Sequence, residues 1–118
     1  TGIEIIETAV SDAKKNCTKN EILNCEFIKG DIKDCLAAVS RRPEVLIIDP
    51  PRAGMHKDVV QQVLNLGSDR IVYVSCNPST LARDLNLLQA AYQIQEVQPV
   101  DLFPHTYHIE SVVRMVKS

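Results

Sequence analysis

The sequence lacks the features that place a chain in a membrane, in the secretory pathway or on a polyanion. No apolar run approaches the roughly 18 residues that a membrane-spanning helix requires, and the first residues do not form a signal peptide. There is no block of five like charges, and the formal net charge is only -2, so the chain has no overall attraction to nucleic acid. We therefore expect a globular cytoplasmic protein without a membrane partner, in which any grip on nucleic acid comes largely from another segment.

Cysteine spacing of the metal-binding or secreted kind is also missing. The four cysteines form neither a Cys-x-x-Cys knuckle nor a convincing disulfide framework. Three of them, Cys17, Cys25 and Cys35, are expected to be small buried or half-buried apolar groups. The chain has 118 residues, 45% of them apolar, and no internal repeat or low-complexity linker. We therefore expect at most one domain, with enough apolar residues to bury a core.

The stretch VLIIDPPRAG, at residues 45–54, carries the clearest local prediction. Its four leading apolar residues, 45–48, are typical of a parallel strand buried on both faces, which would place Asp49 at the carboxyl end. Ligands bind at that end in open α/β sheets. Pro50 and Pro51 stiffen the following loop, which carries Arg52. The stretch predicts a carboxylate and a guanidinium over a crevice, the simpler alternative being a strand and a proline-rich turn.

Hydrophobic periodicity predicts an alternation of strands and helices. Helices are expected near residues 8–19, 32–39, 59–66 and 77–91, and strands at residues 1–6, 25–28, 45–48, 71–74, 92–100 and 111–117. Such alternation favours an α/β fold with a doubly wound, mostly parallel sheet and helices on both faces. The last two strands follow each other without a helix, which indicates one antiparallel strand near the C-terminus, at the edge of the sheet.

Cys76 lies where a nucleophilic cysteine is expected. It follows a predicted strand and precedes a helix that Asn77 caps and Pro78 opens. A helix N-terminus stabilises a thiolate, which is the reactive form of the side chain. The competing interpretation is an inert buried thiol.

Glu110 ends a charged and aromatic loop, HTYHIE, just before the last strand. If Phe103 and Tyr107 shield its carboxylate from water, Glu110 would be suited to take a proton, although a solvated surface glutamate is the simpler alternative. His105 and His108 have no third ligand at suitable spacing, so we predict no metal site. These histidines are expected to hydrogen-bond the loop or to contact a phosphate.

Two further acids follow predicted strands. Glu4 ends the first strand and Asp31 follows Gly30 after the next. In nucleotide-binding α/β folds an acid at such a position accepts hydrogen bonds from ribose hydroxyls. Glu4 is expected in that role, and Asp31 beside an adenine amino group.

Five motifs together resemble one family, the S-adenosylmethionine-dependent RNA 5-methyluridine methyltransferases. They occur in the family's order and spacing, and DPPRAG and SCNP are the specific ones. The resemblance covers essentially the whole chain and corresponds to the C-terminal part of the family's Rossmann-like catalytic domain. The motifs are GIEI (2–5), KGDI (29–32), DPPRAG (49–54), VSCNP (74–78) and DLFPHTYHIE (101–110).

The resemblance implies a covalent mechanism on uridine in tRNA or rRNA. Cys76 would add to carbon 6 of uracil, which makes carbon 5 nucleophilic enough to accept a methyl group. Glu110 would then remove the carbon 5 proton. Asp49 would orient the uracil, and Arg52 would steady the site or the RNA backbone.

The resemblance also implies S-adenosylmethionine as cofactor, held by Glu4, Asp31 and Asp49. The family places a strand and a glycine-bearing loop before GIEI, and often RNA-binding or iron-sulfur segments earlier still. We therefore expect residues 1–118 to be a C-terminal fragment that lacks the first strand and is inactive alone. Its two unpaired strand edges are expected to promote self-association.

Two alternatives remain open at this point. An amino-group methyltransferase, acting on adenine or an amide, commonly has an acid or Asn, then Pro-Pro and an aromatic residue. Here Arg52 stands at the aromatic position, and such enzymes need no nucleophilic cysteine. The other alternative is an inactive truncated domain that serves as an interaction module.

Overall fold

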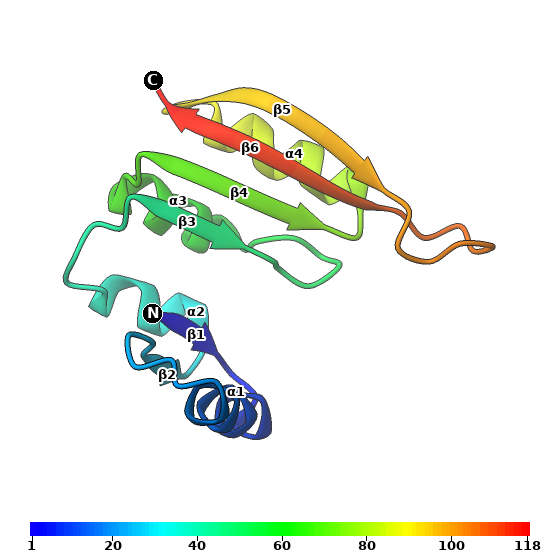
Figure 1. Ribbon diagram of the computed structural model, residues 1–118. Helices are drawn as coiled ribbons and strands as arrows, with labels where there is room; N and C mark the ends of the chain where they lie inside the picture. Colours follow the sequence, from blue (N-terminus) through cyan, green and yellow to red (C-terminus); the bar gives the residue numbers. More distant parts are fainter. The chain divides into compact units, whose positions relative to one another are not determined.

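The computed structural model describes residues 1–118 and divides into two units, Thr1–Ser40 and Arg41–Ser118 (Figure 1). Both combine helices and strands, as the α/β prediction requires. None of the helices is long and apolar enough to cross a membrane.

The first unit is small and has short strands. The strands β1 (Gly2–Glu4) and β2 (Phe27–Lys29) form a parallel pair. Helix α1 (Glu7–Lys19) connects them, and α2 (Ile32–Cys35) continues into the 3-10 turn η1 (Leu36–Ala38). The single helix expected over residues 32–39 is therefore split.

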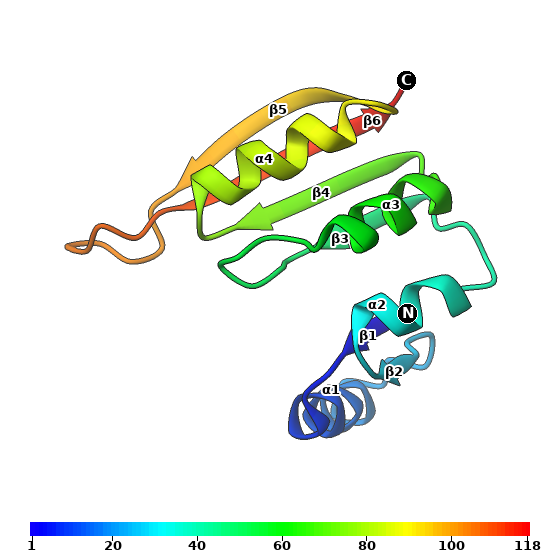
Figure 2. The ribbon, with the colours of Figure 1, turned by 180° about the vertical axis from the view of Figure 1, so that it is seen from behind.

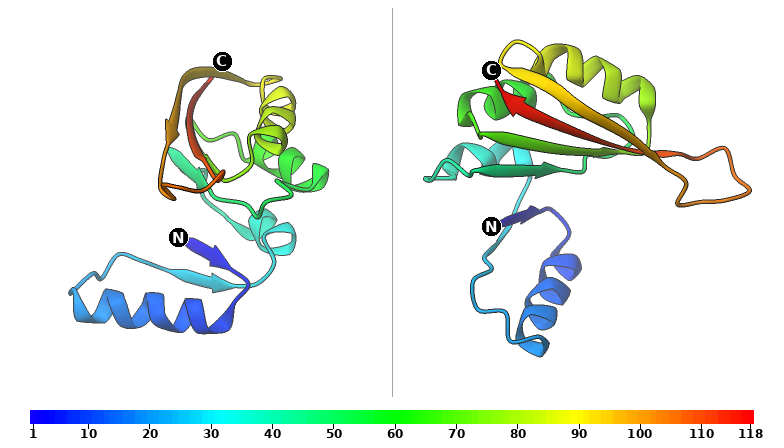
Figure 3. Two further views of the ribbon diagram at one scale, coloured as in Figure 1. Left: turned by 90° about the vertical axis from the view of Figure 1, so that its right-hand side faces the viewer. Right: turned by 45° about the horizontal axis from the view of Figure 1, so that its top comes forward.

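The second unit has a four-stranded sheet with its helices on one face. Figures 2 and 3 show the two helices together on that face. The strand order is β3-β4-β6-β5. The elements are β3 (Val45–Ile48), α3 (Lys57–Leu66), β4 (Arg70–Ser75), α4 (Pro78–Leu88), β5 (Tyr92–Val100) and β6 (Glu110–Lys117).

The antiparallel strand near the C-terminus is confirmed, but its predicted place at the sheet edge is wrong. β6 pairs antiparallel with β4 on one side and with β5 on the other. Its inner residues Val113 and Met115 are fully buried. The parallel strands β4 and β5, which α4 connects, leave a one-strand gap between them, and β6 fills that gap, so β5 is the edge strand.

The prediction that residues 45–48 are buried on both faces is wrong within this unit. Val45 and Ile47 are 41% and 71% exposed. Leu46 is half-buried. It lies on the same face of the sheet as its register partner Ile71, which the helices cover and which is fully buried. β3 is an edge strand, and no helix from residues 41–118 covers its other face. Exposed and half-buried residues therefore alternate along β3.

Two local expectations have different outcomes. Gly67 ends α3 in the left-handed conformation (φ 64°), as expected for a C-terminal glycine. Cys25, however, is exposed rather than buried or half-buried, whereas Cys17 and Cys35 are half-buried as expected. The exposed position follows from the loop that precedes β2.

Candidate active site

Three side chains with reactive chemistry lie at one edge of the second unit's sheet. Asp49 follows the carboxyl end of β3, Cys76 follows the carboxyl end of β4, and Glu110 is the first residue of β6. β4 pairs with both neighbours, and its last residue, Ser75, is the register partner of Ser111. The strand order therefore brings these three positions together, with Cys76 in the middle. Asp49 is exposed, whereas Cys76 and Glu110 are half-buried.

The turn that carries Cys76 is fixed by its two neighbours. The Ser75 hydroxyl donates to the Asn77 carbonyl and accepts from the Asn77 N–H, both at 3.1 Å. Asn77 also caps α4, because its side-chain oxygen accepts from the Ser79 N–H at 3.1 Å. Pro78 occupies the first helical turn, as the sequence predicts. Cys76 is thus held at the N-terminus of an eleven-residue helix.

The loop that carries Arg52 is attached to the same helix. The Arg52 carbonyl accepts from Asn77 Nδ2 and from Thr80 Oγ1, each at 3.1 Å. Gly54 has φ +74°, and a Cβ at this position would lie only 2.7 Å from Asp84 Oδ2. A glycine is therefore required both for the backbone conformation and for the close approach to α4.

Asp84 is the buried residue that holds this loop in place. It is fully buried, and its Oδ2 accepts from the Tyr73 hydroxyl at 2.6 Å and from the Met55 N–H at 2.7 Å. Arg83 pairs with Asp84 at 2.7 Å and donates to the carbonyls of Ala53 and Met55, each at 3.0 Å. Burial and the bond to Asp84 raise the pKa of Tyr73 above its usual range. One carboxylate thus ties β4, the loop and α4 together.

Sequence reasoning missed Asp84, although a signal was present. Leu81, Leu85 and Leu88 form the apolar stripe of α4, and Asp84 lies on that stripe beside Leu85. A carboxylate on a core-facing stripe is costly to bury unless it is paired, so it indicates a buried hydrogen-bond network.

Arg52 approaches the loop before Glu110. Its Nη1 lies 3.4 Å from His108 Nδ1. The His108 ring contacts Tyr107 with centroids 4.3 Å apart and Phe103 edge-on at 6.3 Å. Tyr107 is 85% exposed and Phe103 is 50% exposed. The two rings therefore face solvent and do not shield Glu110 in the way expected from the sequence.

The remaining predicted residues, Glu4 and Asp31, lie in the first unit. They are at the same end of the two-stranded parallel sheet, where the Gly30 N–H donates to the Glu4 carbonyl at 3.0 Å. Glu4 Oε1 accepts from the Ile6 N–H at 2.8 Å, and Asp31 Oδ1 accepts from the Lys33 N–H at 2.9 Å. A carboxylate has about four acceptor sites, so both acids can accept further donors. Glu4 ends β1 and Asp31 follows β2, as expected, and their role in binding a cofactor stays a prediction.

Comparison with protein families gives a match over the whole chain. The family model described as tRNA (uracil-5-)-methyltransferase matches residues 1–118. An uncharacterized RNA methyltransferase of Bacteroides thetaiotaomicron is 55% identical over 116 residues, covering 95% of this chain and 26% of the relative. One of Clostridium tetani is 48% identical over 113 residues, covering 95% of this chain and 25% of the relative. The chain thus spans about a quarter of the length of these relatives.

Solved structures agree with this match. The tRNA (uracil-54, C5)-methyltransferase of Pyrococcus abyssi, solved with S-adenosyl-L-homocysteine, is 38% identical with a TM-score of 0.85. The match covers 98% of this chain and 28% of that one. An rRNA methylase of Streptococcus thermophilus, at 12% identity and a TM-score of 0.72, covers 98% of this chain and 70% of that one, and shows the shared Rossmann-like fold alone. The complete match to the family model and the strand-end site of DPPRAG and SCNP lead to one conclusion: this chain belongs to the tRNA (uracil-5-)-methyltransferase family.

Proposed function

We propose that this chain forms part of an RNA uracil carbon-5 methyltransferase that works through a covalent Cys76–uracil adduct. The observation that carries the proposal is the placement of Cys76 and Glu110 at the ends of the neighbouring strands β4 and β6. A nucleophile and a proton acceptor at adjacent strand ends can act on the two neighbouring carbons of one pyrimidine ring.

Cys76 would supply the nucleophile. Its sulfur adds to carbon 6 of uracil, and the electron pair of the ring double bond moves to carbon 5 as an enolate. The Ser75–Asn77 hydrogen bonds hold the turn in place, so little conformational freedom is lost when the sulfur engages the ring. The helix N-terminus beside Cys76 favours the thiolate form that this addition needs.

Glu110 would complete the reaction as the base. After carbon 5 has gained its methyl group, the Glu110 carboxylate takes the carbon 5 proton. The electrons of that C–H bond re-form the ring double bond, and the bond between carbon 6 and the Cys76 sulfur breaks. Glu110 is half-buried at the start of β6, beside the strand whose carboxyl end is followed by Cys76, and this position supports the assignment.

Asp49, Arg52 and the exposed aromatic rings would contact the RNA. Asp49 can accept a hydrogen bond from the uracil N3–H, while Arg52 can pair with a backbone phosphate. Phe103 and Tyr107 present exposed rings beside His108, and unpaired bases stack on such rings in RNA-binding proteins. We propose tRNA or rRNA as the substrate class, since the Pyrococcus abyssi neighbour is named a tRNA methyltransferase and the curated relatives RNA methyltransferases.

The two acids of the first unit fit the hydrogen-bond donors of S-adenosylmethionine. Ribose hydroxyls and an adenine amino group are hydrogen-bond donors, and Glu4 and Asp31 offer carboxylate acceptors at one sheet end. When bound, this cofactor supplies an electrophilic methyl group. Glu4 would accept from the ribose hydroxyls and Asp31 from the adenine amino group, so both residues act only in binding.

Residues 1–118 alone are proposed to be the C-terminal part of the catalytic domain and to be inactive. The chain spans 28% of the Pyrococcus abyssi enzyme. β1 pairs only with β2 and β3 only with β4, so each strand keeps one unpaired edge through which copies can associate. Calorimetric titration with S-adenosylmethionine should give much weaker binding than for the longer protein. Equal affinities would refute this part of the proposal.

The decisive test of the mechanism is mass spectrometry of the longer protein with 5-fluorouridine RNA and S-adenosylmethionine. Fluorine cannot leave as a proton does, so the expected product is a stable adduct on the peptide that contains Cys76. Cys76→Ala should give no adduct, and Cys35→Ala is the matched control that should still give it. Methyl transfer to adenine without any adduct would instead support an amino-group methyltransferase, and neither adduct nor methyl transfer would support an interaction module.

A further inference from the structure

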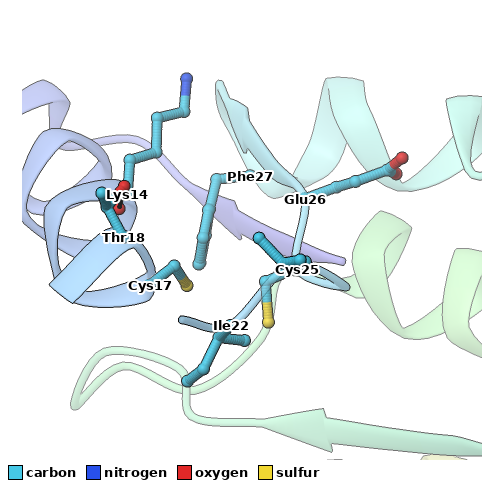
Figure 4. Close-up of a pocket in the computed structure, with 8 residues that line it drawn as sticks. Lys14, Cys17, Thr18, Ile22, Cys25, Glu26 and Phe27 are labelled. Carbon is cyan, nitrogen blue, oxygen red and sulfur yellow. Dashed lines mark hydrogen bonds between the residues drawn. The ribbon is translucent and has the colours of Figure 1, made fainter. Parts of the chain in front are cut away.

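A pair of thiols in the first unit has no role in the proposed reaction. Cys17, on the last turns of α1, and Cys25, two residues before β2, line one hollow of this unit. Figure 4 shows the two sulfur atoms beside each other in the hollow, and the Cys25 thiol influences the pKa of the Cys17 thiol, as expected for neighbouring groups. The Lys14 side chain extends away from both sulfur atoms in the same view.

The backbone explains why two cysteines eight positions apart meet. After α1 the chain reverses at Glu21, which adopts the left-handed conformation (φ 56°). The Ile22 N–H then donates to the carbonyl of Cys17 at 2.9 Å, and the Asn20 N–H donates to the same carbonyl at 3.2 Å. These bonds are typical of a left-handed helix C-cap, and they return the chain past Cys17 before Cys25 is reached.

The two thiols differ in a way that suits sequential chemistry. Cys25 is exposed, whereas Cys17 is half-buried. Burial, followed by the interaction with the Cys25 thiol, raises the pKa of the Cys17 thiol. Cys25 is therefore the sulfur that a small solute can reach more easily.

We infer that Cys17 and Cys25 are an oxidation site that forms a disulfide with a hydroperoxide such as hydrogen peroxide. The Cys25 thiolate attacks one peroxide oxygen, the O–O bond breaks, and the leaving hydroxide takes up the proton that the Cys25 thiol released, so the products are a sulfenic acid and water. The Cys17 sulfur then attacks the Cys25 sulfur, the S–O bond breaks, and the leaving hydroxide takes the Cys17 proton as a second water. Two thiols and one hydrogen peroxide thus give one disulfide and two waters, and a dithiol reduces the disulfide to the two thiols while it is itself oxidised to a disulfide.

The disulfide would constrain the turn that is otherwise open to solvent. It closes a ring over the segment that contains Glu21 and the 96% exposed Leu23. Cleavage of this segment by a protease should therefore be slower in the oxidised chain. Cys35 is not expected to compete, because its sulfur lies against Gly30, where an added Cβ would be only 2.3 Å away.

The test is oxidation of the 118-residue chain with hydrogen peroxide, alkylation in denaturant and peptide mass spectrometry. We expect a Cys17–Cys25 linked peptide as the main product, lighter by two hydrogen atoms and restored by dithiothreitol. Peroxide should consume thiols about tenfold more slowly in Cys25→Ser, whereas Cys17→Ser should keep the rate of the first step and give no linked peptide. The control Cys35→Ser should keep both the normal rate and the linked peptide.

Three outcomes would overturn the inference. One is a disulfide that joins either thiol mainly to Cys35 or Cys76. Another is accumulation of sulfinic acid at Cys25 while Cys17 remains open to alkylation. The third is an equal rate of Cys17–Cys25 linkage in denaturant, because sequence proximity rather than the folded turn would then account for it. None of these readouts depends on methyltransferase activity.

Discussion

The two units differ sharply in how much apolar surface they bury. Arg41–Ser118 contains twelve of the fourteen buried apolar side chains, including Ile71, Leu88 and Met115 at 0% exposure. Thr1–Ser40 contains only two, Val10 and Leu36. Its other large apolar side chains include Ile5, Ile6 and Leu23 at 60%, 57% and 96% exposure.

This difference coincides with a difference in proposed role. The second unit has the reacting groups Cys76 and Glu110 on a packed sheet, with Asp84 fixing the neighbouring loop. In the first unit, the two proposed cofactor acids lie at or just after the ends of three-residue strands. A reacting sulfur must be held within a fraction of an ångström, whereas hydrogen bonds to a ribose tolerate more freedom. The stronger core thus supports the more demanding geometry.

The largest effects should come from two substitutions, one of which removes the reacting sulfur and the other a cofactor ligand. Cys76→Ala should abolish methyl transfer and adduct formation in the longer protein and leave the affinity for S-adenosylmethionine unchanged. Glu4→Ala should weaken that affinity about 10- to 100-fold, because charge-assisted hydrogen bonds to the cofactor are lost. Adduct formation should be unchanged when the cofactor is saturating. Calorimetry and adduct mass spectrometry on both variants provide the measurements. Loss of cofactor affinity in Cys76→Ala would contradict the division of roles.

Glu110→Gln should stop the reaction one step later than Cys76→Ala. The amide cannot take the carbon 5 proton, so methyl transfer occurs and release of the product stalls. A methylated protein–RNA adduct should therefore accumulate with ordinary uridine RNA, and denaturing gels and mass spectrometry would detect it. Ser111→Ala, at the next position of β6, is the control that should turn over. Normal turnover of Glu110→Gln would assign the base to another residue.

Much of the active-site geometry could be predicted because it follows from strand ends. Val45–Ile48 and Tyr92–Val100 match the predicted strands, and Pro78 opens α4 as expected. Once an α/β alternation is established, the ends of parallel strands meet at one edge and bring Asp49 and Cys76 together. These features depend on local patterns and on topology.

The errors have nonlocal causes. The inner place of β6 depends on its pairing with both β4 and β5, two strands that a helix separates in the sequence. The exposure of Ile47 depends on which face the helices cover, since a purely apolar run has the same pattern whether one or both faces are buried. The bonds of Asp84 to Tyr73 and Met55 span 11 and 29 positions, so no local pattern identifies the partners.

Shortening a buried side chain should destabilise the second unit more than the first. Leu88→Ala in the second unit should lower the free energy of unfolding by about 2–5 kcal/mol, since a fully buried leucine leaves a cavity. Val10→Ala in the first unit removes fewer methyl groups from a site with fewer buried neighbours, so about 1 kcal/mol is expected. Urea unfolding followed by circular dichroism measures both changes. Equal losses would mean that the two units share one cooperative core.

The smallest effect is a pH dependence confined to the second unit. Burial and the Asp84 hydrogen bond raise the pKa of Tyr73 above its ordinary value of 10.0. Below that ordinary value both folded and unfolded chains hold the Tyr73 proton, and the contribution to stability is complete. As pH rises further, only the unfolded chain loses this proton, so stability falls by about 1.4 kcal/mol between about pH 9 and about pH 11.

Tyr73→Phe should remove this part of the decline, at a cost of about 1–2 kcal/mol near neutral pH for the lost bond to Asp84. Unfolding free energies from urea titrations across this pH range test the prediction. The variant Tyr107→Phe removes a hydroxyl from an 85% exposed ring and is the matched control, with the wild-type decline expected. Burial also raises the pKa of Tyr92, so a weaker decline of the same sign should remain in Tyr73→Phe. If Tyr73→Phe kept the full decline, the buried Tyr73–Asp84 bond would not be its source.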